Sequence, residues 1–151
     1  MEQVWISLGY QTQLCLRLVL AAVLGGVLGG ERERRDRPAG LRTYMLVSLG
    51  SCLFTILSTT AFPDSESARV AANILTGIGF IGAGTVFRER GDDDGRVKGV
   101  TTAAGLWACA GIGMAVATDF YWLAIIATVI VFVLFTLVKR LEKRFARSSG
   151  Q

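Results

Sequence analysis

The chain has 151 residues, of which 52% are hydrophobic and 19% charged, with a formal net charge of +4 and no histidine. The lack of histidine excludes imidazole metal ligands and histidine-based acid–base chemistry, and no cofactor motif occurs in its proper context, so we expect no enzyme and no resident cofactor. The basic residues gather at the ends of apolar runs instead of forming a dispersed basic face, so we expect a lipid bilayer and no nucleic acid as partner.

The apolar runs are about 17–20 residues long, which is the length that crosses a hydrocarbon core. Pro38 and Pro63 both fall between runs, where a helix would end. We therefore predict an all-α integral membrane protein with a single transmembrane domain over residues 1–147 and a disordered tail over 148–151. No basic segment precedes the first run, so no cleavable signal peptide is expected. The five predicted spans cover residues 14–30, 41–60, 70–87, 100–117 and 120–138.

The distribution of Lys and Arg predicts the orientation. Fourteen of the sixteen basic residues lie in three clusters, namely the first link, the third link and the C-terminal tail. Only five spans bring all three clusters to one side, and the positive-inside rule makes that side cytoplasmic, with the N-terminus outside. Arg17 then lies within the first span, where it must snorkel or pair with an acid, and Asp64 and Glu66 are acids on the correct side.

The ends of the first and third spans are similar. Gly26, residues 32–34 (RER) and Asp36 recur 56 positions later as Gly82, residues 88–90 (RER) and Asp92. This pattern predicts two similar helical hairpins that run in the same direction, with the last helix added at the periphery. The alternative is that basic helix ends resemble one another in any membrane protein.

Small residues at four-residue spacing predict close helix packing. The third span carries glycines on two faces and is expected to be central, with neighbours on both sides. Packing through glycine-rich faces also predicts a homodimer. The predicted packing glycines are Gly25, Gly26, Gly29 and Gly30 in the first span, Gly77, Gly79, Gly82 and Gly84 in the third, and Gly105 and Gly113 in the fourth.

Polar side chains within the spans form the candidate site, since an unpaired polar group in hydrocarbon costs several kcal/mol and must face protein or water. They are either interhelical hydrogen-bonding groups or a polar site between the second, third and fourth helices. Glu31 and Arg42 either pair to fix the first hairpin, or Glu31 binds a cation or proton, as the candidate metal ligand, with Arg42 beside it. The remaining candidates are Arg69, Asn73 and Thr76 on one face of the third helix, and Thr101 and Thr102 at the start of the fourth.

Five ordered stretches resemble the MgtC/SapB family: residues 29–34 (GGERER), 38–43 (PAGLRT), 69–73 (RVAAN), 77–84 (GIGFIGAG) and 99–104 (GVTTAA). The resemblance implies a bacterial inner-membrane protein of ion homeostasis, with magnesium as the transported or sensed ion. One expectation is a small cation transporter with its polar site between helices 2 and 4. The alternative is a regulatory protein that carries no ion and binds another membrane complex, such as the ATP synthase.

Three features distinguish the chain from other members of that family. It ends soon after Arg147, which resembles the short SapB-like form without a C-terminal soluble domain. Asn73 stands where the family often has glutamine, and Thr101 stands where virulence-type members have an asparagine. The resemblance therefore implies the family's fold and location more directly than its virulence role.

Overall fold

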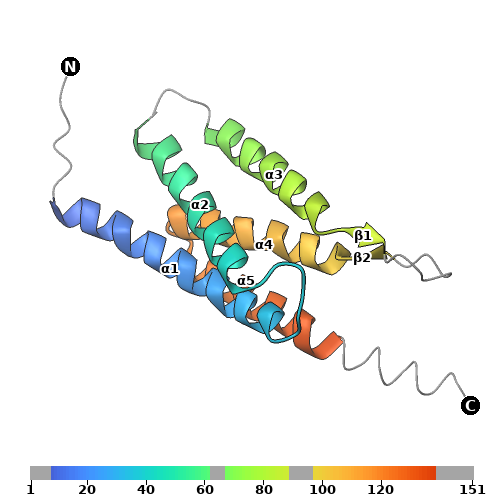
Figure 1. The fold of residues 1–151 in the computed structure, drawn as a ribbon. Coiled ribbons are helices and arrows are strands. Elements are labelled where there is room, and N and C mark those ends of the chain that lie inside the picture. The colour runs from blue at the N-terminus through green and yellow to red at the C-terminus, as the bar shows by residue number, and fades with distance from the viewer. Residues whose placement is uncertain (1–7, 62–66, 89–96, 139–151) are drawn as a thin grey trace, which may run out of the picture.

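The computed structural model describes residues 8–61, 67–88 and 97–138, and these residues form an all-helical fold, as predicted (Figure 1). A short antiparallel pair of strands between α3 and α4, with Phe87 opposite Lys98, was not predicted. The elements are α1 (Leu8–Glu33), α2 (Leu41–Thr60), α3 (Ser67–Gly84), β1 (Phe87–Arg88), β2 (Val97–Lys98), α4 (Val100–Ala117), α5 (Tyr121–Val133) and the π-helical turn η1 (Leu134–Val138), which continues α5.

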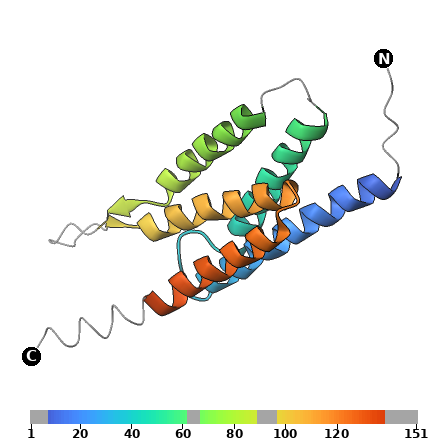
Figure 2. The same cartoon turned by 180° about the vertical axis from the view of Figure 1, so that it is seen from behind.

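Helix α4 is the central element. It contacts α1, α2, α3 and α5, whereas α3 packs against α2 and α4 on the side away from α5 (Figure 2). The prediction that the third helix is central, with neighbours on both glycine faces, is therefore wrong for this chain. Gly82 faces Ala103 of α4, but a Cβ added at Gly77, Gly79 or Gly84 would meet no atom within 4 Å.

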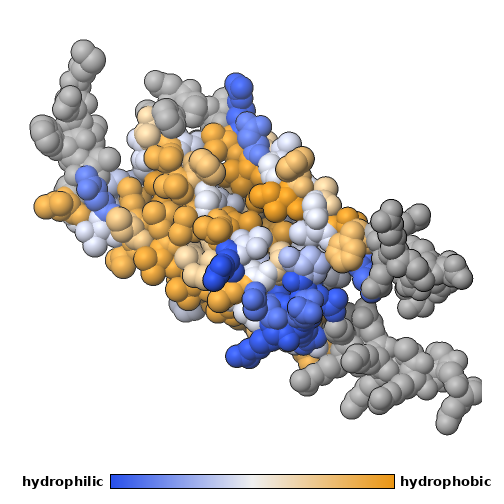
Figure 3. Space-filling model, viewed as in Figure 1, coloured by the Kyte–Doolittle hydropathy of each residue, from blue (hydrophilic) through white to orange (hydrophobic). Residues whose placement is uncertain are grey.

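The outer surface of the bundle is apolar. Three helices, α1, α2 and α4, are long and apolar enough to cross a membrane, by length and composition, and the apolar parts of α3 and α5 are shorter. Hydrophobic side chains cover the middle of the face in Figure 3, while hydrophilic ones gather where α1 ends and α2 begins. Phe80 of α3 and Trp122 of α5 are 85% and 78% exposed, which suits contact with lipid better than with water. The chain is a membrane protein on these grounds.

Glycines allow α1, α2 and α4 to approach one another at backbone distance. A Cβ at Gly29 would lie 2.8 Å from Cα of Leu41, one at Gly25 would lie 2.9 Å from Cβ of Ser48, and one at Gly113 would overlap the carbonyl of Ser48. Such contacts are typical of membrane helices, where small residues increase van der Waals contact. The three helices therefore form a tightly packed core.

Two links between helices are closed by specific groups. The backbone N–H of Leu41, at the start of α2, donates a 2.9 Å hydrogen bond to Oε2 of Glu33, so a carboxylate from the end of α1 caps the next helix. Gly99 precedes α4 with a φ of 95°, and a Cβ there would overlap the carbonyl of Thr85. The strand pair also ends α3 at Gly84, three residues before the predicted limit of the span.

Candidate functional site

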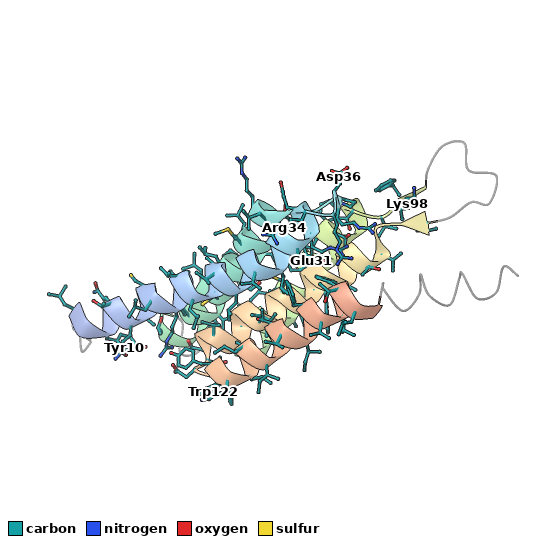
Figure 4. The ribbon with its side chains drawn as sticks, turned by 90° about the horizontal axis from the view of Figure 1, so that it is seen from below. Tyr10, Glu31, Arg34, Asp36, Lys98 and Trp122 are labelled. Carbon is teal, nitrogen blue, oxygen red and sulfur yellow. The ribbon has the colours of Figure 1, made fainter. Side chains whose placement is uncertain are left out.

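Most of the described charged groups gather at one end of the bundle. Glu31, Arg34, Asp36 and Lys98 lie at this end in Figure 4, and Tyr10 and Trp122 lie at the other. We call the first the charged end; it contains the end of α1, the start of α2, the start of α4 and the end of α5. Two of its charged side chains are buried: Glu31 is 7% exposed and Arg32 is 4% exposed.

Arg32 is held by α4 and by η1. Its Nη2 donates a 2.8 Å hydrogen bond to Oγ1 of Thr102, which is 1% exposed. Its guanidinium lies 4.4 Å from the centroid of the Phe135 ring, in cation–π geometry. A buried arginine without partners would cost several kcal/mol, so these contacts are what allow a cation at this depth.

Tyr44 completes the cluster from α2. Its hydroxyl donates to the backbone carbonyl of Thr102 at 3.3 Å, and its ring meets Phe135 edge to face, with centroids 6.4 Å apart. Gly105 makes room for this arrangement, because an added Cβ would clash with the Tyr44 hydroxyl and the Phe135 ring. We call Arg32, Tyr44, Thr102 and Phe135 the Arg32 centre; it joins α1, α2, α4 and η1.

Glu31 forms an ion pair with Arg35, one turn further along α1. Arg42, its expected partner, is exposed. Within the described ranges, no group of three or more Asp, Glu, Cys or His side chains is placed to hold a metal ion. Glu31 is therefore a buried carboxylate that is paired with Arg35, and its role as a metal ligand stays a prediction.

The other predicted polar residues lie in separate places. Thr102 belongs to the Arg32 centre, and Thr101 lines a pocket beside it. Arg69 and Asn73 are on exposed positions of α3, and Asn73 lines a groove between α2 and α3. Thr76 donates to the carbonyl of Ala72 at 2.9 Å, within its own helix.

Thr55 and Thr59 of α2, like Thr76, donate to carbonyls of their own helix. Thr55 donates to the carbonyl of Ser51 at 2.8 Å, and Thr59 donates to the carbonyl of Thr55 at 3.1 Å. Threonine hydroxyls can satisfy themselves on the preceding turn of a helix, so a threonine stripe needs neither a neighbouring helix nor water. The threonines of α2 and Thr76 therefore give no support to either expectation, interhelical hydrogen bonds or a polar site.

Two hollows adjoin these residues. The basic pocket, of about 420 Å³, is lined by Arg32, Arg37, Gly99, Thr101, Thr102, Ala104, Gly105, Ala108, Val131, Leu134 and Phe135. The α2/α3 groove, of about 640 Å³, is mostly apolar, with Thr43, Ser51 and Asn73 as its polar side chains. The two hollows share no lining residue.

At the opposite end, Arg17 pairs with an acid, as expected, but the acid is not one of those proposed. Its Nη2 lies 2.6 Å from Oδ1 of Asp119, and its Nη1 donates to the carbonyl of Ala117 at 2.9 Å. Asp64 and Glu66 lie outside the described residues. Asp119 follows α4 with a φ of 66°, which turns the chain toward α5.

Sequence reasoning missed Arg32, Tyr44 and Phe135. A signal for Arg32 was present in the helical phase, because it follows the buried residues Gly25 and Leu28 by seven and four positions and so shares their face. The rings of Tyr44 and Phe135 carry no comparable signal, since their meeting depends on the close approach at Gly105.

Comparisons with known proteins find relatives that match most of the chain. The model of the MgtC family matches residues 18–144. The chain is 40% identical over 125 residues, 78% of its length, to "Putative magnesium transporter YhiD" of Escherichia coli, and 45% identical over 116 residues, 77% of its length, to Protein MgtC of Salmonella typhimurium. It spans about half the length of these relatives, 56% and 48%. No solved structure matches it.

Proposed function

Because the chain belongs to the MgtC family, we propose that it acts in magnesium homeostasis as a protein of the bacterial inner membrane. The magnesium role is supported by the name of one relative and by the resemblance of the motifs. We propose five membrane crossings with the charged end in the cytoplasm and the N-terminus outside. The gathering of Arg34 and Lys98 at one end, with Tyr10 and Trp122 at the other, supports this orientation.

Within that role we propose a regulatory protein rather than a conduit for Mg²⁺. Gly25 and Gly113 both bring their helices against Ser48 of α2, which leaves little room for a hydrated ion between α1, α2 and α4. Mg²⁺ loses its hydration waters reluctantly, so a narrow passage without water opposes its entry. The packed core favours a protein that acts through its surface and its charged end.

The Arg32 centre is the observation that carries this proposal. A cation that is 4% exposed lies at the inner end of the bundle and would repel a divalent cation that approached it. Its contacts connect four elements, so a partner that binds the charged end can alter how those helices pack. The partner class we propose is another membrane complex, such as the ATP synthase that the family resemblance suggests.

Growth at low magnesium tests whether the Arg32 centre matters. In a strain that depends on this protein, Thr102→Val removes the acceptor of Arg32 while it keeps the side-chain shape. We expect reduced growth at low magnesium, with an unchanged amount of protein in the membrane. Thr76→Val is the matched control, because that hydroxyl bonds, among the described residues, within its own helix. Equal growth of both variants and the wild type would refute a role for the centre.

Cation transport along the α2/α3 groove is the second candidate. Thr43, Ser51 and Asn73 give this otherwise apolar groove its polar side chains. Transport predicts that a cysteine at Asn73, in a Cys15→Ala background, reacts with water-soluble thiol reagents in membranes. A cysteine at Ile126, on the exposed apolar surface of α5, is the control and should stay unreactive. Lack of reaction at Asn73 would exclude an aqueous path there.

A further inference from the structure

The basic pocket at the charged end has features that the magnesium role does not explain. It lies between the end of α1, the start of α4 and the junction of α5 with η1. Two of its lining side chains are arginines, and no carboxylate lines it among the described residues. The nearby carboxylate of Glu31 is already paired with Arg35. A pocket with this lining favours an anion.

The two arginines retain hydrogen-bonding capacity. Nη2 of Arg32 is bound to Thr102, but its buried Nε has no hydrogen-bond partner among the described residues. The buried Nε of Arg37 likewise meets no acceptor in the described part of the chain. A guanidinium presents its donors in a planar fork that matches the oxygens of a phosphate group. Two such groups at one pocket provide both charge and direction for that ligand.

The start of α4 adds further donors on the same wall. The first backbone N–H groups of a helix have no partner inside it. Gly99, which precedes α4, provides no side-chain cap for them. The hydroxyl-bearing Thr101 and Thr102 also line the pocket. The N-terminus of a helix attracts anions through these N–H groups and through its dipole. This wall therefore attracts an anion, as do the buried Arg32 and the partly buried Arg37.

The rest of the pocket is apolar and leads along the helices. Ala104 and Ala108 of α4 face Val131 and Leu134 of α5 and η1, and Leu134 is 53% exposed. Inorganic phosphate gains nothing from contact with an apolar wall, whereas an acyl chain packs favourably against one. On the orientation proposed above, the arginines lie at the cytoplasmic interface of the membrane and the apolar wall lies deeper. The basic part of the pocket thus lies where a phospholipid has its headgroup, and the apolar part lies where it has its acyl chains.

We propose that the basic pocket binds a phosphate group, with an anionic phospholipid of the cytoplasmic leaflet as its source. Arg37 and the start of α4 bind the phosphate, Arg32 contributes its positive charge, and the α4/α5 wall accommodates part of an acyl chain. The choice of lipid as the source rests on the proposed membrane orientation. Binding of the phosphate itself depends only on the pocket.

Native mass spectrometry of the purified full chain tests this proposal, with phosphatidylglycerol and phosphatidylcholine offered in the same detergent. We expect phosphatidylglycerol to bind preferentially. Arg37→Gln should weaken it roughly tenfold, as expected for the loss of a charge-assisted hydrogen bond. Arg34→Gln is the matched control, because Arg34 is exposed at the same end and does not line the pocket. It should bind the lipid as the wild type does.

A second variant separates the pocket from general surface charge. Thr101→Val leaves the net charge unchanged and should also weaken phosphatidylglycerol binding. Equal weakening by Arg34→Gln and Arg37→Gln, with none by Thr101→Val, would overturn the pocket in favour of a diffuse basic surface. Equal binding by all variants would overturn it as well.

Inorganic phosphate, added without lipid, separates the two sources. We expect it to raise the melting temperature of the wild type little. If phosphate alone raises it strongly, and Arg37→Gln abolishes the effect, the site is upheld as a phosphate site and the lipid source is refuted. None of these measurements depends on magnesium, so failure here is distinguishable from failure of the proposed role in magnesium homeostasis.

Discussion

Gly105 lies where α4 passes the Phe135 ring and the Tyr44 hydroxyl, and both would clash with an added Cβ. We expect Gly105→Ala to lower the free energy of unfolding by about 1–3 kcal/mol, the usual cost of overpacking a core. Gly111→Ala, in the same helix, is the matched control: its Cβ would meet no atom within 4 Å, and alanine favours a helix, so no loss is expected. Unfolding in detergent measures both. Equal stability of the two variants would contradict this packing.

The ion pair of Arg17 and Asp119 provides a second prediction at this scale. Asparagine tolerates the positive φ of Asp119, so Asp119→Asn removes the charge without straining the backbone. Because Asp119 is 58% exposed, we expect a coupling energy with Arg17→Gln of only roughly 0.2–1 kcal/mol in a double-mutant cycle. Fully additive effects would mean that the pair contributes nothing to stability.

Residue roles were only partly predictable. The sequence indicated that charged residues at the end of the first span matter, but it favoured Glu31 with Arg42, whereas the structure pairs Glu31 with Arg35 and buries Arg32. The first link holds five arginines, and composition does not tell which of them is buried. The helical phase gives that information. Thr102 was singled out because it opens the fourth helix, although its partner was not predicted.

At the scale of elements, hydropathy and prolines were enough to locate the five helices, because each apolar run is long and ends at charged or glycine-rich segments. The strand pair was missed because it has two residues on each side, too short for any periodicity. The π-helical turn η1 was missed because its sequence continues the apolar run of α5. The central position of α4 depends on which glycines meet a neighbour, and spacing alone does not reveal this.

The exposed glycine face of α3 allows a specific form of the predicted homodimer. We propose that two copies meet through the face that carries Gly77 and Gly84, where backbone can approach backbone. A cysteine at Phe80, in a Cys15→Ala background, should then cross-link between copies in membranes. A cysteine at Trp122, another exposed aromatic position, is the control and should not. Cross-linking at Trp122 alone would contradict the α3 interface.

At the scale of the whole molecule, the charged end and the opposite end, where Tyr10 and Trp122 lie, define the long axis of the bundle (Figure 4). With five crossings and an N-terminus outside, a cysteine at Thr118 should react with an impermeant thiol reagent added outside intact cells. A cysteine at Arg34 should react only after the membrane is opened. Both positions are exposed, so a difference in labelling reports the side of the membrane. The reverse pattern would invert the orientation and move the basic pocket to the outer leaflet.

Magnesium flux tests the central claim of a regulatory role most directly. The purified protein is reconstituted into liposomes that contain a Mg²⁺ indicator, and a Mg²⁺ gradient and a membrane potential are imposed. We predict no flux above that of empty liposomes, because the helix core is packed at backbone distance and the charged end carries the buried cation Arg32. A Mg²⁺ flux that Asn73→Ala or Glu31→Gln abolishes, with the variant still folded, would contradict the account and identify a transporter.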